Sequence, residues 1–265
     1  MRKIFKFTCL TLLIFYSFTN TSSAQKREIV PLNKHFFILN SSKNKAQAYN
    51  QITTKESKDK STSKIYTLSN RLVKTIEDSY NMSEKFNQRL IYRYDTLGQL
   101  TSFTLFNLDD RIYLTRYYRN DTILAEVLKA DYDKVKITLP DSESIELGFN
   151  PYISGPPPLA VWNEYLAKNL DYPVSARRAG NSGTVVIAIK INEMGKLVEF
   201  ELANPEHTAR DLGREALRVV EKYDGFWRPA INTDGEVVED WSYLPIRFVL
   251  SGDDIPFAGN LDLAW

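Results

Sequence analysis

The sequence has few of the residues from which most catalytic and metal centres are built. Its 265 residues include one cysteine and two histidines. The cysteine, Cys9, lies in the N-terminal leader, so the rest of the chain has no thiolate nucleophile, no disulfide and no cysteine metal site. His35 and His207 do not form an H-x-x-x-H pair. We therefore predict a protein without a metal ion or another cofactor.

Short motifs of the common enzyme classes are also missing. The chain holds no phosphate-binding loop and no dinucleotide fingerprint, and its acidic residues are too scattered to name a glycosidase pair. Residues 180–183, GNSG, do not fit a nucleophile elbow, because they follow a predicted helix and precede a predicted strand. We predict that the protein is not an enzyme.

A strong net charge is absent. The chain has 34 basic and 33 acidic side chains, a net charge of +1. Removing Arg2, Lys3 and Lys6 with the leader leaves 31 basic against 33 acidic side chains, a net charge of −2. A nearly neutral chain has no field that would hold a nucleic acid, so we predict no nucleic-acid partner. A hydrophobic content of 43% is enough for a buried core.

Residues 1–24 have the pattern of a signal peptide. Three basic residues precede an uncharged, mainly apolar run over residues 7–18, and Ser22 and Ala24 are small residues before a cleavage site that leaves Gln25 first. The alternative is a membrane-spanning helix, but a bilayer span needs about 20 apolar residues. We predict export to the periplasm with cleavage of the leader; a retained leader would keep the protein at the membrane.

Residues 25–150 are predicted to be rich in strands. An apolar cluster over residues 35–39 predicts a first strand, and the polar stretch after it predicts a flexible linker up to residue 64. Residues 65–150 alternate apolar and polar side chains between Asp, Asn and Gly turns, which indicates an antiparallel meander. The unit from Tyr94 to Leu100, YDTLGQL, resembles the hairpins of MORN and YD repeats. We assign this module no function.

Residues 151–250 predict a separate domain. The stretch GPPP at 155–158 is a stiff break. Beyond it, periodicity and turn residues predict helices at 159–170, 174–179 and 210–220, and strands at 184–191, 197–202 and 237–250. Residues 251–265 form a tail without a predicted structure. The expected class is α+β.

Several motifs in this domain occur in the order of one known family. They are Y-P-x-x-A-R-x-x-G-x-x-G-T-V from Tyr172, the turn NEMGK at 192–196, EAL at 215–217, W-x-P from Trp227 and L-P-I-x-F from Leu244. Together they resemble the C-terminal domain of TonB over roughly residues 155–250. The resemblance implies a small three-stranded antiparallel sheet backed by two or three helices.

The last predicted strand is the expected binding surface. Pro245 lies within it and donates no ladder hydrogen bond, which favours an edge position, where an extended peptide can add to the sheet. The resemblance implies that this peptide belongs to an outer-membrane transporter. The predicted edge comprises Val238, Glu239, Asp240, Trp241, Ser242, Tyr243, Leu244, Ile246 and Phe248, flanked by Arg177, Trp227 and Arg228. For Trp227 and Tyr243, a place in the core is the alternative, and for Trp227 we favour it, because a tryptophan beside a proline often packs under a small sheet.

A second function stays open. The chain lacks the long Pro/Lys/Glu linker that an energy transducer needs to cross the periplasm, and it has a β-rich module instead. The alternative is therefore a structural or assembly protein of the cell envelope that acts through this module. A homodimer is compatible with either function.

Overall fold

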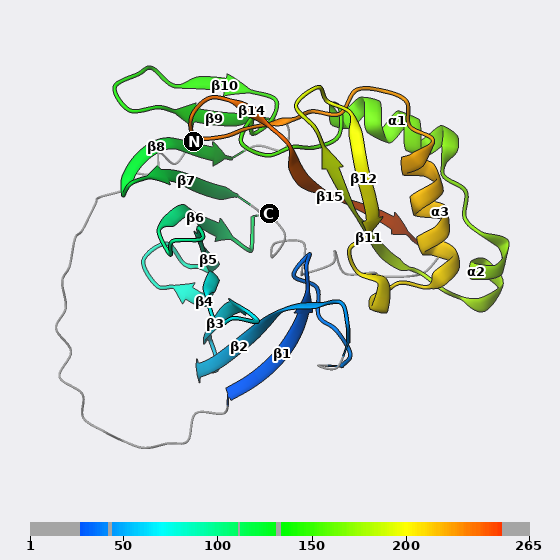
Figure 1. Ribbon diagram of the computed structural model, residues 1–265, viewed down its shortest axis with the longest axis horizontal. Coiled ribbons are helices and arrows are strands. Elements are labelled where there is room, and N and C mark those ends of the chain that lie inside the picture. The colour runs from blue at the N-terminus through cyan, green and yellow to red at the C-terminus, as the bar shows by residue number, and fades with distance from the viewer. Residues whose placement is uncertain (1–26, 42–43, 111, 131–133, 251–265) are drawn as a thin grey trace.

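The computed structural model describes residues 27–41, 44–110, 112–130 and 134–250. A large antiparallel sheet is followed by a smaller sheet that carries helices on one face (Figure 1). This arrangement confirms the predicted α+β class. The predicted signal peptide and the tail after Leu250 lie outside the described residues. None of the described helices is long and apolar enough to cross a membrane.

The large sheet is a meander in which each strand pairs with the next one along the chain. Asp95 closes a typical turn, because its carboxylate accepts the N–H groups of Leu97 and Gln99 at 2.8 Å while Gly98 takes a φ of +83°. The ten strands are β1 (Arg27–Asn33), β2 (Gln47–Ser57), β3 (Lys60–Thr67), β4 (Leu72–Asn81), β5 (Phe86–Tyr94), β6 (Leu100–Asn107), β7 (Tyr113–Arg119), β8 (Thr122–Lys129), β9 (Val135–Thr138) and β10 (Ile145–Leu147).

The predicted linker up to residue 64 is wrong, because β2 and most of β3 lie there. The two strands pair in one register from Tyr49 to Lys55, and the register shifts before Ser57. Their side chains are polar but include β-branched residues such as Thr53, whose hydroxyl bonds Ser63 across the strands at 2.8 Å. No residue of β2 is fully buried, so a polar sequence is tolerated in these strands and has the composition of a linker.

The predicted first strand over residues 35–39 is also wrong. The first strand is β1, and residues 33–39 form a tight reversal that we call the hook. The side chain of Asn33 accepts the N–H groups of His35 at 2.9 Å and Phe37 at 3.1 Å, and Phe36 takes a φ of +64°. An asparagine that bonds nearby backbone groups in this way favours a turn over a strand.

The smaller sheet has the strand order β12-β11-β15. Its strands are β11 (Gly183–Ile191), β12 (Leu197–Leu202) and β15 (Asp240–Phe248). The helices are α1 (Leu159–Asn169), α2 (Val174–Ala179) and α3 (Arg210–Glu221), with a short 3-10 turn η1 at Pro205–His207. Two further strands, β13 (Ala230–Ile231) and β14 (Val237–Val238), pair only with each other.

The core of this domain lies between the sheet and the helices. Alternate residues of β11, from Val185 to Ile191, pack there against Leu212 and Val219 of α3. Trp227 is 1% exposed and stands 5.4 Å from Trp162, between ring centroids. Trp227 therefore belongs to the core, which is the position that the sequence favoured.

Candidate peptide-binding edge

β15 pairs on one side only. It runs antiparallel to β11, with Gly183–Ile191 opposite Asp240–Phe248, and lies at the edge of the three-stranded sheet (Figure 1). Such an edge tolerates Pro245. The predicted edge began two residues too early, because Val238 lies in β14 and Glu239 follows it outside β15. Glu239 instead forms an ion pair with Lys190.

The pairing shows which backbone groups of β15 point away from β11. The N–H of Val186 donates to Asn204 Oδ1 at 2.9 Å, and its carbonyl accepts the N–H of Ala203 at 2.8 Å. Both groups thus point toward β12, so Val186 and its partner Pro245 form a non-hydrogen-bonded pair. By the alternation of the ladder, Trp241 and Tyr243 share the orientation of Pro245. We call this the outer side of β15.

The outer side offers few hydrogen-bond donors. Pro245 has no N–H, so the strand lacks a backbone donor at that position. Among the described residues, no backbone group bonds Tyr243 on this side. A strand added to β15 would therefore find both a donor and an acceptor at Tyr243.

The predicted edge residues divide between two faces of the sheet. Leu244, Ile246 and Phe248 are at most 2% exposed and belong to the core under the helices. Ser242 is buried too, and its hydroxyl donates to the carbonyl of Ser154 at 2.8 Å. These side chains stabilise the sheet and do not line a surface. Trp241 and Tyr243 lie on the opposite face.

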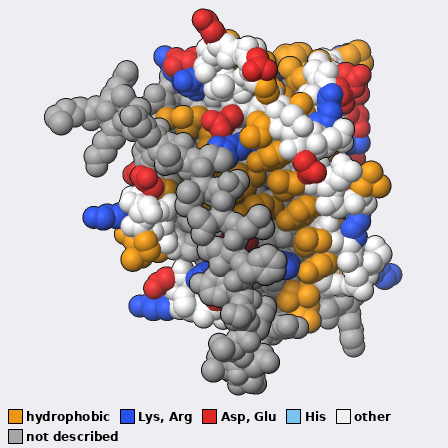
Figure 2. Space-filling view, turned by 90° about the vertical axis from the view of Figure 1, so that its left-hand side faces the viewer, with side chains coloured by type: hydrophobic (Ala, Val, Ile, Leu, Met, Phe, Trp, Pro, Cys, Tyr) orange, Lys and Arg blue, Asp and Glu red, His pale blue; other side chains and the backbone are white. Residues whose placement is uncertain are grey.

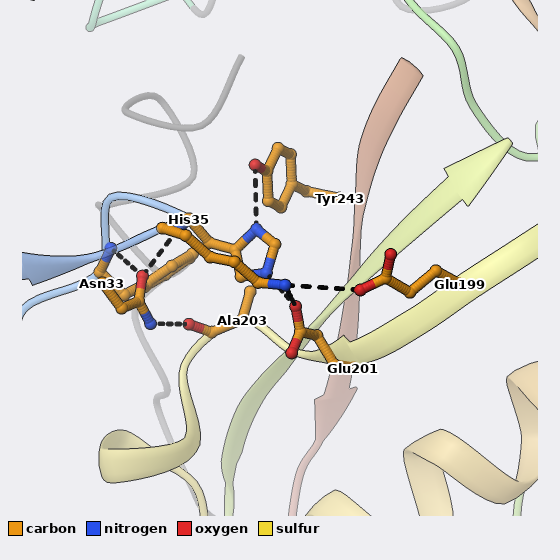
Figure 3. A network of polar contacts seen from close by, with 8 residues as sticks. Asn33, His35, Glu199, Glu201, Ala203 and Tyr243 are labelled. Atoms are coloured by element: carbon orange, nitrogen blue, oxygen red, sulfur yellow. Dashed lines mark hydrogen bonds and ion pairs between the residues drawn. The ribbon is translucent and has the colours of Figure 1, made fainter. Parts of the chain in front are cut away.

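That opposite face is covered by the hook, a contact that the sequence did not reveal. His35 is 3% exposed and reaches two strands of the smaller sheet (Figure 3). Its Nε2 lies 2.7 Å from Glu201 Oε1 on β12, and its Nδ1 lies 3.3 Å from the hydroxyl of Tyr243 on β15. The ring also meets the edge of Trp241, with centroids 5.0 Å apart.

These contacts fit a neutral imidazole. Burial lowers the pKa of His35 and outweighs the opposing effect of Glu201. Burial also raises the pKa of Tyr243, so its hydroxyl keeps its proton and can donate to Nδ1. Nε2–H then donates to Glu201. Although burial opposes it, hydrogen bonds from Lys34 and His35 lower the pKa of Glu201, which is therefore a carboxylate at neutral pH.

Further contacts join the hook to the domain. Asn33 Nδ2 donates to the carbonyl of Ala203 at 2.8 Å (Figure 3). Phe37 is 4% exposed and packs with Val186 and Ala188 on the same face of the sheet. His207 is exposed, and its Nε2 lies 3.0 Å from the carbonyl oxygen of Ile38. The large sheet and the smaller domain are thus connected through a buried interface.

The two predicted flanking arginines lie toward opposite ends of β15. Arg177 of α2 is exposed and lies over the ring of Tyr172, which meets the edge of Phe248. Arg228 exchanges two backbone hydrogen bonds with Gly155, and its guanidinium lies 4.3 Å from the centroid of Phe149. Burial lowers the pKa of Arg228. Arg228 thus contributes to the packing of residues 149–156 against the domain.

Arg93 is a further residue that the sequence did not single out. It lies opposite Lys74 in the β4–β5 ladder. Its Nη2 atom is buried and has no acceptor among the described residues. Burial lowers the pKa of Arg93 to about 10, so it remains a cation at neutral pH. Arg93 and Tyr243 are close enough that each affects the pKa of the other.

In the described part of the chain, no group of three or more His, Cys, Asp or Glu residues could hold a metal ion.

Comparison with known proteins identifies the C-terminal domain. Residues 168–250 match the family of the Gram-negative bacterial TonB protein C-terminal domain. The match includes all three strands of the smaller sheet, α2, α3 and the end of α1. No curated protein and no solved structure matches the chain.

Proposed function

Because residues 168–250 belong to the family of TonB C-terminal domains, we propose that this protein binds an extended peptide of an outer-membrane transporter by adding it to β15. The family links the chain to the cell envelope and to energy transduction for transport. The proposed location is the periplasm, after cleavage of the leader. The protein would act in or beside the transduction system, as a binding protein without catalysis.

The outer side of β15 is the observation that carries the proposal. Peptides that add to an edge strand are held mainly by main-chain hydrogen bonds, so the site needs exposed backbone groups more than a pocket. Tyr243 presents both groups, and Pro245 presents a carbonyl alone. We therefore expect the peptide to pair around Tyr243, with Trp241 and Arg177 near the two ends of the contact.

Cross-linking in cells tests this site. The side chain of Tyr243 is buried against the hook, so photoreactive residues are better placed at Glu239 and Val249, which flank β15 and are exposed. Both should trap an outer-membrane transporter. Val198 of β12, 49% exposed on the opposite edge of the sheet, is the matched control and should not. Equal cross-linking of a transporter from Val198, or no cross-linking from Glu239 and Val249, would refute the proposal.

The alternative function, assembly through the β-rich module, rests on the outer face of the large sheet. Leu90, Leu105, Leu114 and Leu128 pair in register across β5 to β8 and form an apolar row. Figure 2 shows hydrophobic side chains gathered on the side of the molecule turned away from the smaller sheet. A sheet with two apolar faces is usually covered on both. This face could therefore serve a homodimer or another envelope protein.

Deleting residues 155–265 would not separate the two functions, because it would expose Phe37 and the rest of the hook. A double substitution of Leu90 and Leu105 by serine is cleaner. If the module carries the function, the variant should lose its envelope partners while cross-linking from Glu239 persists. Partner recovery at the wild-type level would argue against assembly through this face.

A further inference from the structure

A row of four leucines crosses the outer face of the large sheet. They lie opposite one another in register on β5 to β8 and comprise Leu90, Leu105, Leu114 and Leu128. Ile91, the next residue after Leu90, points to the other face and packs there with Phe36 of the hook. The three described helices all pack on the smaller sheet, so none of them covers the leucines. Figure 2 shows hydrophobic side chains gathered on this side of the molecule, and such a face is typical of an interface.

The leucine row ends in opposite charges. Glu77 of β4 lies opposite Leu90, and Lys136 of β9 lies opposite Leu128. Side chains that are directly opposite in an antiparallel ladder share one face of the sheet, so the row reads Glu-Leu-Leu-Leu-Leu-Lys over six strands. Among the described residues, neither Glu77 nor Lys136 forms an ion pair. The two charges lie about 24 Å apart, because five strand spacings of about 4.8 Å separate them.

A second row on the same face also differs between its two halves. Tyr92 and Phe103 lie opposite each other on β5 and β6, and their ring centroids are 5.2 Å apart. On the next two strands follow Arg116 and Glu126, whose side chains form an ion pair at 2.8 Å. Both charged side chains are about one third exposed, at 31% and 36%. One half of this row is thus aromatic and the other half is charged.

We propose that the protein forms a homodimer through this face, with a two-fold axis that runs along the strands between β6 and β7. The axis reverses the order of the strands in the second copy, so each row packs on its own reverse. Leucines then meet leucines along the first row, and Glu77 meets Lys136 of the second copy at both ends. In the second row, Arg116 lies over the ring of Phe103 of the second copy, which is a favourable cation–π contact. Two sheets that pack face to face in this way lie about 10 Å apart.

The charges select this orientation of the second copy. A two-fold axis across the strands would pack each row on itself in the same direction. Glu77 would then meet Glu77, and Arg116 would meet Arg116, and like charges in an interface oppose binding. A second copy turned about the axis along the strands supplies the opposite charge at each end of the leucine row, without any other protein.

The dimer leaves β15 of both copies open. The hook reaches the smaller sheet from the other face of the large sheet, where Phe36 packs with Ile91 and Phe37 packs with Val186. Peptide binding to β15 therefore does not depend on the dimer. The dimer rests on the alternative function in using the same face, and it names a second copy of the chain as the partner.

Sedimentation equilibrium of the exported protein tests the dimer. Glu77→Lys and Lys136→Glu each replace two attractive contacts by repulsive ones, so each should raise the dissociation constant about tenfold at low ionic strength. The double variant Glu77→Lys/Lys136→Glu should restore the wild-type value, because the two charges are exchanged. Glu84→Lys, at an exposed position between β4 and β5, makes the same change of charge, is the matched control and should have no effect.

The outcomes separate the dimer from the functions proposed above. A wild-type protein that stays monomeric up to about 0.1 mM would refute the dimer, and a dimer that neither single charge reversal weakens would refute this arrangement. A monomer that still cross-links to a transporter from Glu239 would leave peptide binding to β15 standing. A monomer that loses an envelope partner on substitution of Leu90 and Leu105 by serine would overturn the dimer in favour of a different protein on this face.

Discussion

At the scale of single residues, His35 shows how a buried titratable group can tie two sheets together. Five groups surround it: Lys34 in the hook, Glu199 and Glu201 on β12, and Trp241 and Tyr243 on β15. Its neutral form donates to Glu201 and accepts from Tyr243. A protonated ring has no acceptor to offer the hydroxyl of Tyr243, so protonation would break one of these two hydrogen bonds.

We predict that the hook interface weakens as the pH falls below about 6.5. The pKa of His35 is lowered in the folded protein, chiefly by burial. Between its ordinary and its folded pKa, the unfolded chain binds a proton that the folded protein does not. The free energy of unfolding therefore decreases as the pH falls through this range.

Urea denaturation at pH 7.5 and at pH 5.0 measures the effect. The lowered pKa of Glu201 changes the free energy of unfolding mainly below 4.5, the ordinary pKa of a glutamate. Glu201 therefore contributes little to the change in stability between pH 7.5 and pH 5.0. His35→Gln, which retains a hydrogen-bond donor, should lose less stability than the wild type between the two pH values. An equal loss in both proteins would show that His35 does not titrate as described.

At the scale of elements, the two sides of β15 differ in their backbone hydrogen bonds. The inner side pairs with β11, whereas the outer side pairs with no strand of the described sheet. Ser242 and Leu244 direct their backbone groups toward β11, whereas Tyr243 directs its own outward. A substitution by proline removes a backbone N–H, so the loss of stability depends on whether that N–H pointed toward β11 or outward. Proline scanning can therefore test the assigned orientation directly.

We predict opposite outcomes at neighbouring positions of β15. The free energies of unfolding of Tyr243→Pro and Tyr243→Ala should differ by no more than about 1 kcal/mol, because the proline removes no hydrogen bond to β11. Ser242→Pro should be about 3 kcal/mol less stable than Ser242→Ala, because it removes a ladder bond. The alanine variants are controls for the lost side chains. Denaturant titration of the four proteins gives the comparison, and the reverse order would invalidate the orientation.

The elements of the smaller domain could be predicted because local signals agree there. A run of apolar and β-branched residues marks β11, the 3.6-residue period marks α3, and Gly180 ends α2 in the left-handed conformation. β2 was missed because neither of its faces is fully buried, which removes the alternation on which strand prediction depends.

The candidate site was predictable only in part. Pro245 indicated the edge strand from the sequence alone. Which side chains of the strand face the helices depends on the packing of the sheet, so the sequence did not separate Leu244, Ile246 and Phe248 from Trp241 and Tyr243. His35 and Glu201 are 166 residues apart and share no local pattern, so their contact follows from the packing of the two sheets alone.

At the scale of the whole molecule, the hook makes the two sheets a coupled pair. It buries Phe37 against Val186 and Ala188 and adds hydrogen bonds from Asn33 and His35. Near the other end of the large sheet, Arg119 bonds the carbonyl of Thr233 and forms an ion pair with Asp234. Contacts at two separate places favour unfolding of both parts together.

We predict a single unfolding transition when the two parts are observed separately. Trp162, Trp227 and Trp241 lie in the C-terminal domain, so in a Trp265→Phe background the tryptophan fluorescence reports on this domain, whereas far-ultraviolet circular dichroism is dominated by the ten-stranded sheet. The two signals should change at the same urea concentration. In Phe37→Ser, which places a hydroxyl in the interface, the transitions should separate, whereas Phe226→Ser, at a position 63% exposed, should leave them coincident. Separate transitions in the wild type would mean that the hook does not couple the sheets.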